Sequence, residues 1–122
     1  MIDTAITQNC TEIIVNTRTA RVFLVRYLDF QNGCVLSISE DLHRLGSLYV
    51  STAFSNSVRT AKVIPNVTDS LFLNTVSERI ASMINGLAIV NFSSKNQLNN
   101  SDMEDITAEI LKFIKRWNYT KR

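Results

Sequence analysis

A single histidine is the first candidate for acid–base chemistry in this sequence. His43 lies in a polar stretch together with Glu40, Asp41 and Arg44. A Cys/His or Ser/His nucleophilic pair would have to depend on this one imidazole, which further groups would need to orient. No such set accompanies it in the sequence. We therefore expect no catalytic residues and no enzymatic activity.

Ligands for a metal ion or a phosphate group are equally scarce. Cys10 and Cys34 lack Cys-x-x-Cys spacing, and with one histidine they do not provide the three or four converging ligands of a zinc site. In a reducing compartment, such cysteines act as small hydrophobic side chains. The three glycines are too dispersed for a phosphate-binding loop. We expect no metal and no cofactor.

Two groups of charged residues near the C-terminus suggest further functions. Glu104 and Asp105 could form an acid/base pair, but adjacent helical residues point about 100° apart and acidic residues are favoured in a first helical turn. The second group is a basic tail beside Trp117 and Tyr119, which could contact phosphates; it comprises Lys112, Lys115, Arg116, Lys121 and Arg122. Positive charges are favoured at helix C-termini, and the net charge is only +2. We expect no nucleic-acid partner.

Length and composition are those of one globular domain. The chain has 122 residues, 45% of them hydrophobic and 20% charged, which suffices for a single core. We expect one domain over residues 1–122. The sequence shows no basic region followed by an apolar run at its start, and no stretch approaches the ~20 apolar residues of a membrane span. We expect a cytoplasmic protein, with the nucleus as an additional location, and no membrane partner.

Short β-branched and aromatic runs separated by polar turns predict five strands in the first half of the chain. These runs cover residues 12–16, 20–28, 34–39, 47–51 and 60–64. Asn32-Gly33, between the second and third runs, readily supplies the positive φ angles of a tight hairpin. Leu45-Gly46 closes the next connection. We expect a five-stranded antiparallel meander.

The apolar period changes after Pro65. Hydrophobic residues recur at three- and four-residue steps over residues 72–84, which predicts a helix that begins near Thr68 or Asp69 and ends at Asn85-Gly86. A sixth strand follows over residues 87–92.

The last segment has the clearest helical pattern. Ser101 and Glu104 have the spacing of a capping box, and one apolar stripe follows: Met103, Ile106, Ile110, Phe113, Ile114 and Trp117. The predicted fold is α+β: a six-stranded, mainly antiparallel sheet in the order βββββαβα, with two helices on one face.

Both faces of the predicted sheet are apolar. Residues 20–28 place Val22, Leu24 and Leu28 on one face, and Phe23, Val25 and Tyr27 on the other. Two helices of about 16 residues cover one such face, which leaves about 500 Å² of largely apolar sheet exposed. We therefore predict a dimer that pairs through the second face as a β-sandwich. The alternative is that the helices cover opposite faces. The residues that we assign to the pairing face are Phe23, Val25, Tyr27, Val90 and Phe92.

The sequence resembles the proteasome assembly chaperone 3 family nearly from end to end. The similar segments are Thr11-Glu12-Ile13-Ile14, Arg44-Leu45-Gly46-Ser47-Leu48 and Thr60-Ala61-Lys62-Val63-Ile64. Residues 68–73 also resemble a segment of the sister family, chaperone 4, so that family remains the alternative.

The resemblance implies a non-enzymatic factor for 20S proteasome assembly. Such a factor pairs through its sheet, as a homodimer or with a sister chaperone, guides α-subunits into their ring and leaves when β-subunits arrive. The family's loop between the fourth and fifth strands is mobile and contacts an α-subunit. Here that loop would cover residues 52–59, in which Phe54, Asn56 and Arg59 are plausible anchors. The alternative function is a longin- or roadblock-like adaptor that binds small GTPases or trafficking proteins.

Overall fold

The computed structural model describes residues 10–121, and the side chains through residue 117. Six strands and two helices follow one another in the predicted order βββββαβα. Their bounds are β1 Cys10–Asn16, β2 Val22–Phe30, β3 Gly33–Glu40, β4 Ser47–Phe54, β5 Ser57–Ile64, α1 Ser70–Ile84, β6 Leu87–Ser93 and α2 Asn100–Lys121. The α+β class and the mainly antiparallel six-stranded sheet are thereby confirmed.

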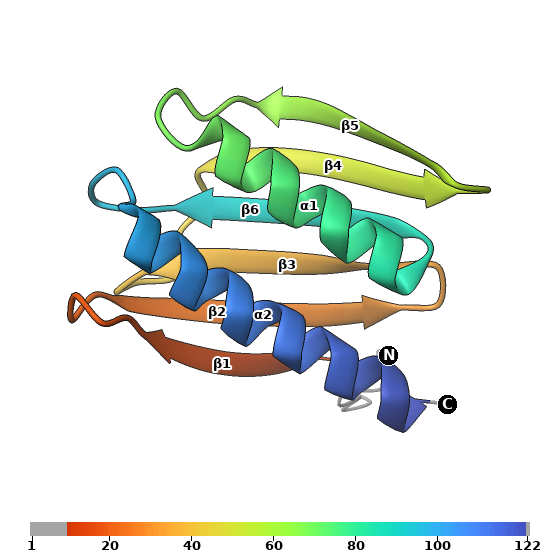
Figure 1. Ribbon diagram of the computed structural model, residues 1–122, viewed down its shortest axis with the longest axis horizontal. Helices are drawn as coiled ribbons and strands as arrows, with labels where there is room; N and C mark the ends of the chain where they lie inside the picture. The colour runs from red at the N-terminus through yellow and green to blue at the C-terminus, as the bar shows by residue number, and fades with distance from the viewer. Residues whose placement is uncertain (1–9, 122) are drawn as a thin grey trace, which may run out of the picture.

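The strands lie in the order β1-β2-β3-β6-β4-β5, so the first five do not form the predicted meander. The last strand enters between β3 and β4 (Figure 1), where it pairs parallel to β3 and antiparallel to β4. A parallel pair needs a long crossover connection, and the chain from β4 to the end of α1 supplies it. Because β6 occupies the centre, the connection from β3 to β4, residues 41–46, must pass the end of β6.

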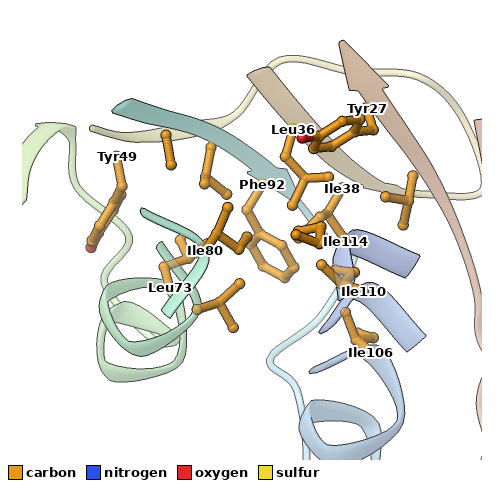
Figure 2. Close-up of a cluster of buried hydrophobic side chains, with 14 of the residues drawn as sticks. Tyr27, Leu36, Ile38, Tyr49, Leu73, Ile80, Phe92, Ile106, Ile110 and Ile114 are labelled. Carbon is orange, nitrogen blue, oxygen red and sulfur yellow. The ribbon is translucent and has the colours of Figure 1, made fainter. Parts of the chain in front are cut away.

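Both helices lie on the same face of the sheet (Figure 1), as predicted. Their apolar stripes meet the inward side chains of the strands in one core, and Figure 2 shows Phe92 of β6 among side chains of both helices. Leu73 and Ile80 come from α1, and Ile106, Ile110 and Ile114 from α2; all five are at most 1% exposed. Trp117 packs against Tyr27 at 5.9 Å between ring centroids, so it belongs to this core, as the stripe predicted.

The start of α2 differs from the predicted capping box, whereas α1 begins after Asp69 and ends at Asn85, as predicted. At the start of α2, the Asp102 N–H donates to Asn99 Oδ1 at 2.7 Å, so Asn99 is the N-cap and the Ser101–Glu104 capping box does not form. At the end of α1, Asn85 adopts the left-handed conformation, with φ of 50°, before Gly86 is reached. Asn is one of the few residues other than glycine that adopt this conformation.

Two hairpins have two-residue turns of different kinds. In the β4–β5 turn, Ser55 and Asn56 have φ of 48° and 67°, the left-handed pair of a type I′ turn. The β2–β3 turn has no residue with positive φ, so Gly33 is not needed for the turn that the sequence predicted. Gly33 instead permits close approach, because a Cβ atom there would lie 2.1 Å from the carbonyl oxygen of Leu87.

A buried ionic cluster ties the start of α2 to the sheet. Arg21, before β2, donates to Glu40 of β3 at 2.7 Å and to Asp102 of α2 at 3.1 Å. The Thr19 hydroxyl also donates to Asp102, whose side chain is fully buried. Arg21 further donates to the carbonyl groups of Asn96 and Gln97 in the β6–α2 connection. One guanidinium therefore joins a strand end, a connection and a helix start.

Hydrogen bonding to Arg21 lowers the pKa of Glu40, in spite of the opposing effect of burial. Burial would raise the pKa of Asp102, but hydrogen bonds from Thr19, Thr17 and Arg21 outweigh it and hold that pKa below its usual value. Both carboxylates are therefore charged at neutral pH, and the cluster needs the arginine to balance them.

Candidate functional site

The face of the sheet away from the helices, here called the open face, is apolar at one end. At this end, one residue from each strand lies in register across the sheet: Cys10, Leu28, Val35, Ile89, Val50 and Ala61. We call this set the apolar row. It crosses all six strands without a charged side chain. Its residues are exposed or half-buried, whereas their neighbours on the helix side are mostly buried.

A second row lies one step closer to the β2–β3 turn. It consists of Phe30, Gly33, Leu87, Thr52 and Arg59, which are Cα partners across five strands. Gly33 leaves a gap in this row. A hollow of about 240 Å³ lies there, lined by Phe30, Val35, Leu87 and Ile89 among others.

At the other end of the open face, the central strands β3 and β6 carry polar side chains and are covered. Asn91 of β6 donates to Ser37 Oγ at 2.9 Å and to the carbonyl oxygen of Arg44 at 2.8 Å, and it accepts from the Gly46 N–H at 2.8 Å. Ser39 Oγ donates to the same Arg44 carbonyl. These side chains hold the β3–β4 connection over β3 and β6 at this end of the open face, whereas the apolar row remains accessible.

His43 lies in this connection and reaches Glu12 of β1, with Nε2 3.2 Å from Oε1. Glu12 also pairs with Arg26 of β2 at 3.7 Å. The hydrogen-bond partner of this imidazole is a carboxylate that is shared with an arginine. The geometry is that of a surface hydrogen bond.

The five side chains that the sequence assigned to the pairing face lie on the helix side. Phe23, Val25, Tyr27, Val90 and Phe92 are at most 1% exposed and belong to the core. This assignment was therefore wrong, because both faces are apolar and alternation alone does not decide which face the helices cover. The sequence did contain a distinguishing feature: Glu12 and Arg26 alternate onto the open face, where their charges stay in solvent.

The three residues proposed to contact an α-subunit lie in a tight hairpin rather than in a loop. Strands β4 and β5 extend to Phe54 and from Ser57, so only Ser55 and Asn56 form the turn. The hairpin tip projects beyond the end of α1 (Figure 1). Phe54 is 63% exposed, and its alternation with Thr52 places it on the open face. Arg59 pairs with Thr52 and lies on the same face.

The remaining chemically reactive groups do not converge. Cys10 is exposed on the open face, whereas Cys34 is buried beneath the helices. Burial raises the pKa of the Cys34 thiol to about 12. Glu104 and Asp105 both bind Arg18, each at 3.0 Å. The described residues include no group of three or more potential metal-binding side chains.

The basic tail is only partly described. Lys112, Lys115 and Arg116 are exposed on α2, and the side chains of residues 118–122, including Tyr119, lie outside the described part of the chain. Within that part, no helix is long and apolar enough to cross a membrane.

The fold is that of a small α+β domain with one sheet face that its helices do not cover. No family model and no curated protein matches the sequence. The structure is similar to that of a chain in the crystal structure of a chaperone complex for yeast 20S proteasome assembly, with a TM-score of 0.62 and 12% sequence identity. The similarity covers 86% of this chain and 98% of that chain. At this identity it establishes a shared fold.

Proposed function

We propose that this protein is a non-enzymatic chaperone of 20S proteasome assembly, which acts as a dimer and promotes formation of the α-ring. The observation that carries the proposal is the fold shared along nearly the whole of a chain from a yeast proteasome-assembly chaperone complex. The resemblance of residues 11–14, 44–48 and 60–64 to chaperone 3 supports it from the sequence.

Pairing through the open face is the second part of the proposal. Six strands at about 4.8 Å spacing and about 17 Å length present roughly 500 Å² of flat area. About half of that area, the end that the β3–β4 connection leaves free, can be buried, which would contribute on the order of 5 kcal/mol for each copy before association costs. Hydrophobic residues of the apolar row, such as Leu28, Val35 and Ile89, would then form the centre of a β-sandwich, with the helices outside.

Contact with an α-subunit is the third part. The β4–β5 hairpin projects from the domain, and its turn residue Asn56 and the neighbouring Arg59 are exposed beside the open face. A short rigid hairpin loses less entropy on binding than a long loop, so it suits a contact that must form and later release. We place the α-subunit contact at Asn56 and Arg59.

Affinity capture from a cell extract tests the client. Tagged protein should recover 20S α-subunits, and the Asn56→Ala/Arg59→Ala variant should recover fewer. Glu109→Ala, an exposed change on the solvent side of α2, is the matched control. Recovery of small GTPases or trafficking proteins without α-subunits would contradict the proposal and support the adaptor alternative.

Reconstitution tests the activity. Purified α-subunits should assemble into rings faster with the protein than without it, as followed by native electrophoresis. An unchanged assembly rate at a saturating concentration of the protein would argue against a role in α-ring formation.

A further inference from the structure

The open face carries a projecting aromatic side chain and an apolar hollow at the same end. Phe54 is 63% exposed at the end of β4. The hollow of about 240 Å³ lies between Phe30 and Leu87, two strands away from β4 at Gly33. Phe54 does not line it. Phe54 therefore has no pocket within its own chain, and Phe54 does not fill the hollow at Gly33.

The hollow follows from the backbone and is not an accident of side-chain choice. Strands β3 and β6 approach so closely at Gly33 that a Cβ atom would lie 2.1 Å from the Leu87 carbonyl oxygen. Glycine is thus required there, and the open face lacks a side chain at that point. Phe30 and Leu87 stand on either side as apolar walls.

Strand order relates the two features by symmetry. Strand β6 lies between β3 and β4. When two open faces meet around a two-fold axis that runs along β6, β4 of one copy lies over β3 of the other. Thr52 shares the level of Gly33 through Leu87, and Phe54 lies two residues further, about 7 Å along the strand. This offset is within reach of an aromatic side chain that leans along its strand.

We propose that the partner on the open face is a second copy of this chain, and that Phe54 of each copy enters the hollow of the other at Gly33. This inference rests on the proposed pairing through the sheet, and it assigns Phe54 to that pairing rather than to the α-subunit. A symmetric interface uses the same patch twice. Phe54, here called the knob, therefore enters a hollow in both halves of the dimer.

The charges of the face favour the same occupant. The apolar row and the walls of the hollow carry no charge, and Arg59 lies at the sheet edge on β5, away from the axis along β6. The exposed ion pair of Glu12 and Arg26 lies on the two strands at the opposite edge. A two-fold axis along β6 therefore brings no like charges together at the centre of the interface.

Sedimentation equilibrium of the purified full chain measures the effect. Phe54→Ala should weaken the dimer about 100-fold in Kd, because two anchors are lost and each contributes about ten-fold. Val58→Ala is the matched control: it removes an exposed apolar side chain of the same hairpin, 39% exposed, on the helix side. It should leave Kd unchanged within about two-fold.

A complementary variant tests the hollow itself. Val35→Phe should fill the hollow and weaken the homodimer as much as Phe54→Ala does. A mixture of the two variants retains one intact knob facing one open hollow, so mixed dimers should form about ten-fold more tightly than either variant alone. An unchanged melting temperature of each variant, extrapolated to the monomer at low concentration, shows that both still fold.

The outcomes separate this inference from the pairing on which it rests. Ile89→Asp places a charge in the centre of the apolar row and should dissociate any sheet-paired dimer. If Ile89→Asp dissociates the dimer while Phe54→Ala and Val35→Phe do not, the insertion of Phe54 into the partner's hollow is overturned, but the pairing through the open face stands. A wild-type chain that is monomeric alone and dimeric only with another chain overturns the second copy as the occupant. A monomer under all conditions overturns both.

Discussion

Replacing Arg21 by methionine should destabilise the fold more than any other single change of a charged residue in the described part of the chain. Methionine keeps the long apolar stem and removes the guanidinium, which ties Glu40, Asp102 and two backbone carbonyls together. Asp102 is fully buried and Glu40 is only 8% exposed, so neither carboxylate can regain water without moving α2.

The expected cost follows from the loss of one partner of a buried ion pair, about 3–5 kcal/mol. Unfolding entropy of about 2.1 cal/mol/K per residue over 122 residues gives about 0.26 kcal/mol/K. Arg21→Met should therefore lower the melting temperature by about 12–20 °C at pH 7. Circular dichroism during thermal unfolding, with a urea titration for the free energy, provides the measurement.

Arg18→Met is the matched control for this experiment. Arg18 also pairs with two carboxylates of α2, Glu104 and Asp105, but it is 61% exposed, and exposed ion pairs contribute little. The melting temperature should change only slightly. A drop for Arg21→Met no larger than that for Arg18→Met would refute the burial argument.

A rescue variant distinguishes the loss of attraction between Arg21 and the carboxylates from the cost of burying those carboxylates without a partner. Arg21→Met combined with Glu40→Gln and Asp102→Asn removes all three charges and leaves groups of similar shape. Because most of the cost of Arg21→Met comes from burying unpaired carboxylates, the triple variant should be more stable than Arg21→Met alone. Lower stability of the triple variant would mean that hydrogen bonding by the carboxylates, rather than their charge, holds α2.

Three further outcomes follow from the structure. Asp102 and Glu40 have lowered pKa values, so the stability that they contribute is complete above the unfolded pKa values of about 3.9 and 4.3 and is lost as the pH falls further. Urea titrations between pH 7 and pH 2 should show this loss. Asp102→Asn should reduce the slope of the free energy of unfolding against pH. With the thiol pKa raised to about 12, Cys34 should resist a thiol reagent at pH 8 while the exposed Cys10 reacts, and equal rates would contradict the buried position. Ser55 has φ of 48°, and Ser55→Asn should raise the free energy of unfolding by about 0.5 kcal/mol in urea, since Asn tolerates this conformation better.

Local patterns predicted the elements because their causes are local. Alternation in residues 20–28 reflects the two sides of one strand, and the stripe from Met103 to Trp117 reflects one side of one helix. The position of β6 was not predictable in this way. Its pairing with β3 joins Gly33 to Leu87 across half the chain, and no short-range pattern distinguishes a central strand from an edge strand when both faces are apolar.

The sequence predicted an apolar sheet face that the helices leave uncovered, but the residues were assigned to the wrong face for the same reason. The sequence required some cover for a second apolar face, but Phe23 and Leu24 are equally hydrophobic, and only the helices decide which one is buried. Charge would have been the better guide. Glu12 and Arg26 share a face with Leu24, and a face that carries such side chains is not the one that two helices bury.

The division of the open face restricts how any partner sheet lies on it. Asn91 and Ser39 bind the crossing β3–β4 connection, so a second sheet placed squarely over the first would collide with that connection. A two-fold axis along β6 keeps the two sheets at the same level along the strands, so the sheets must diverge toward this connection and approach each other most closely near the β2–β3 turn. Phe54 lies at that end of the sheet, inside the interface, and the turn at Asn56 lies at its rim, where an α-subunit and a second copy can be contacted together.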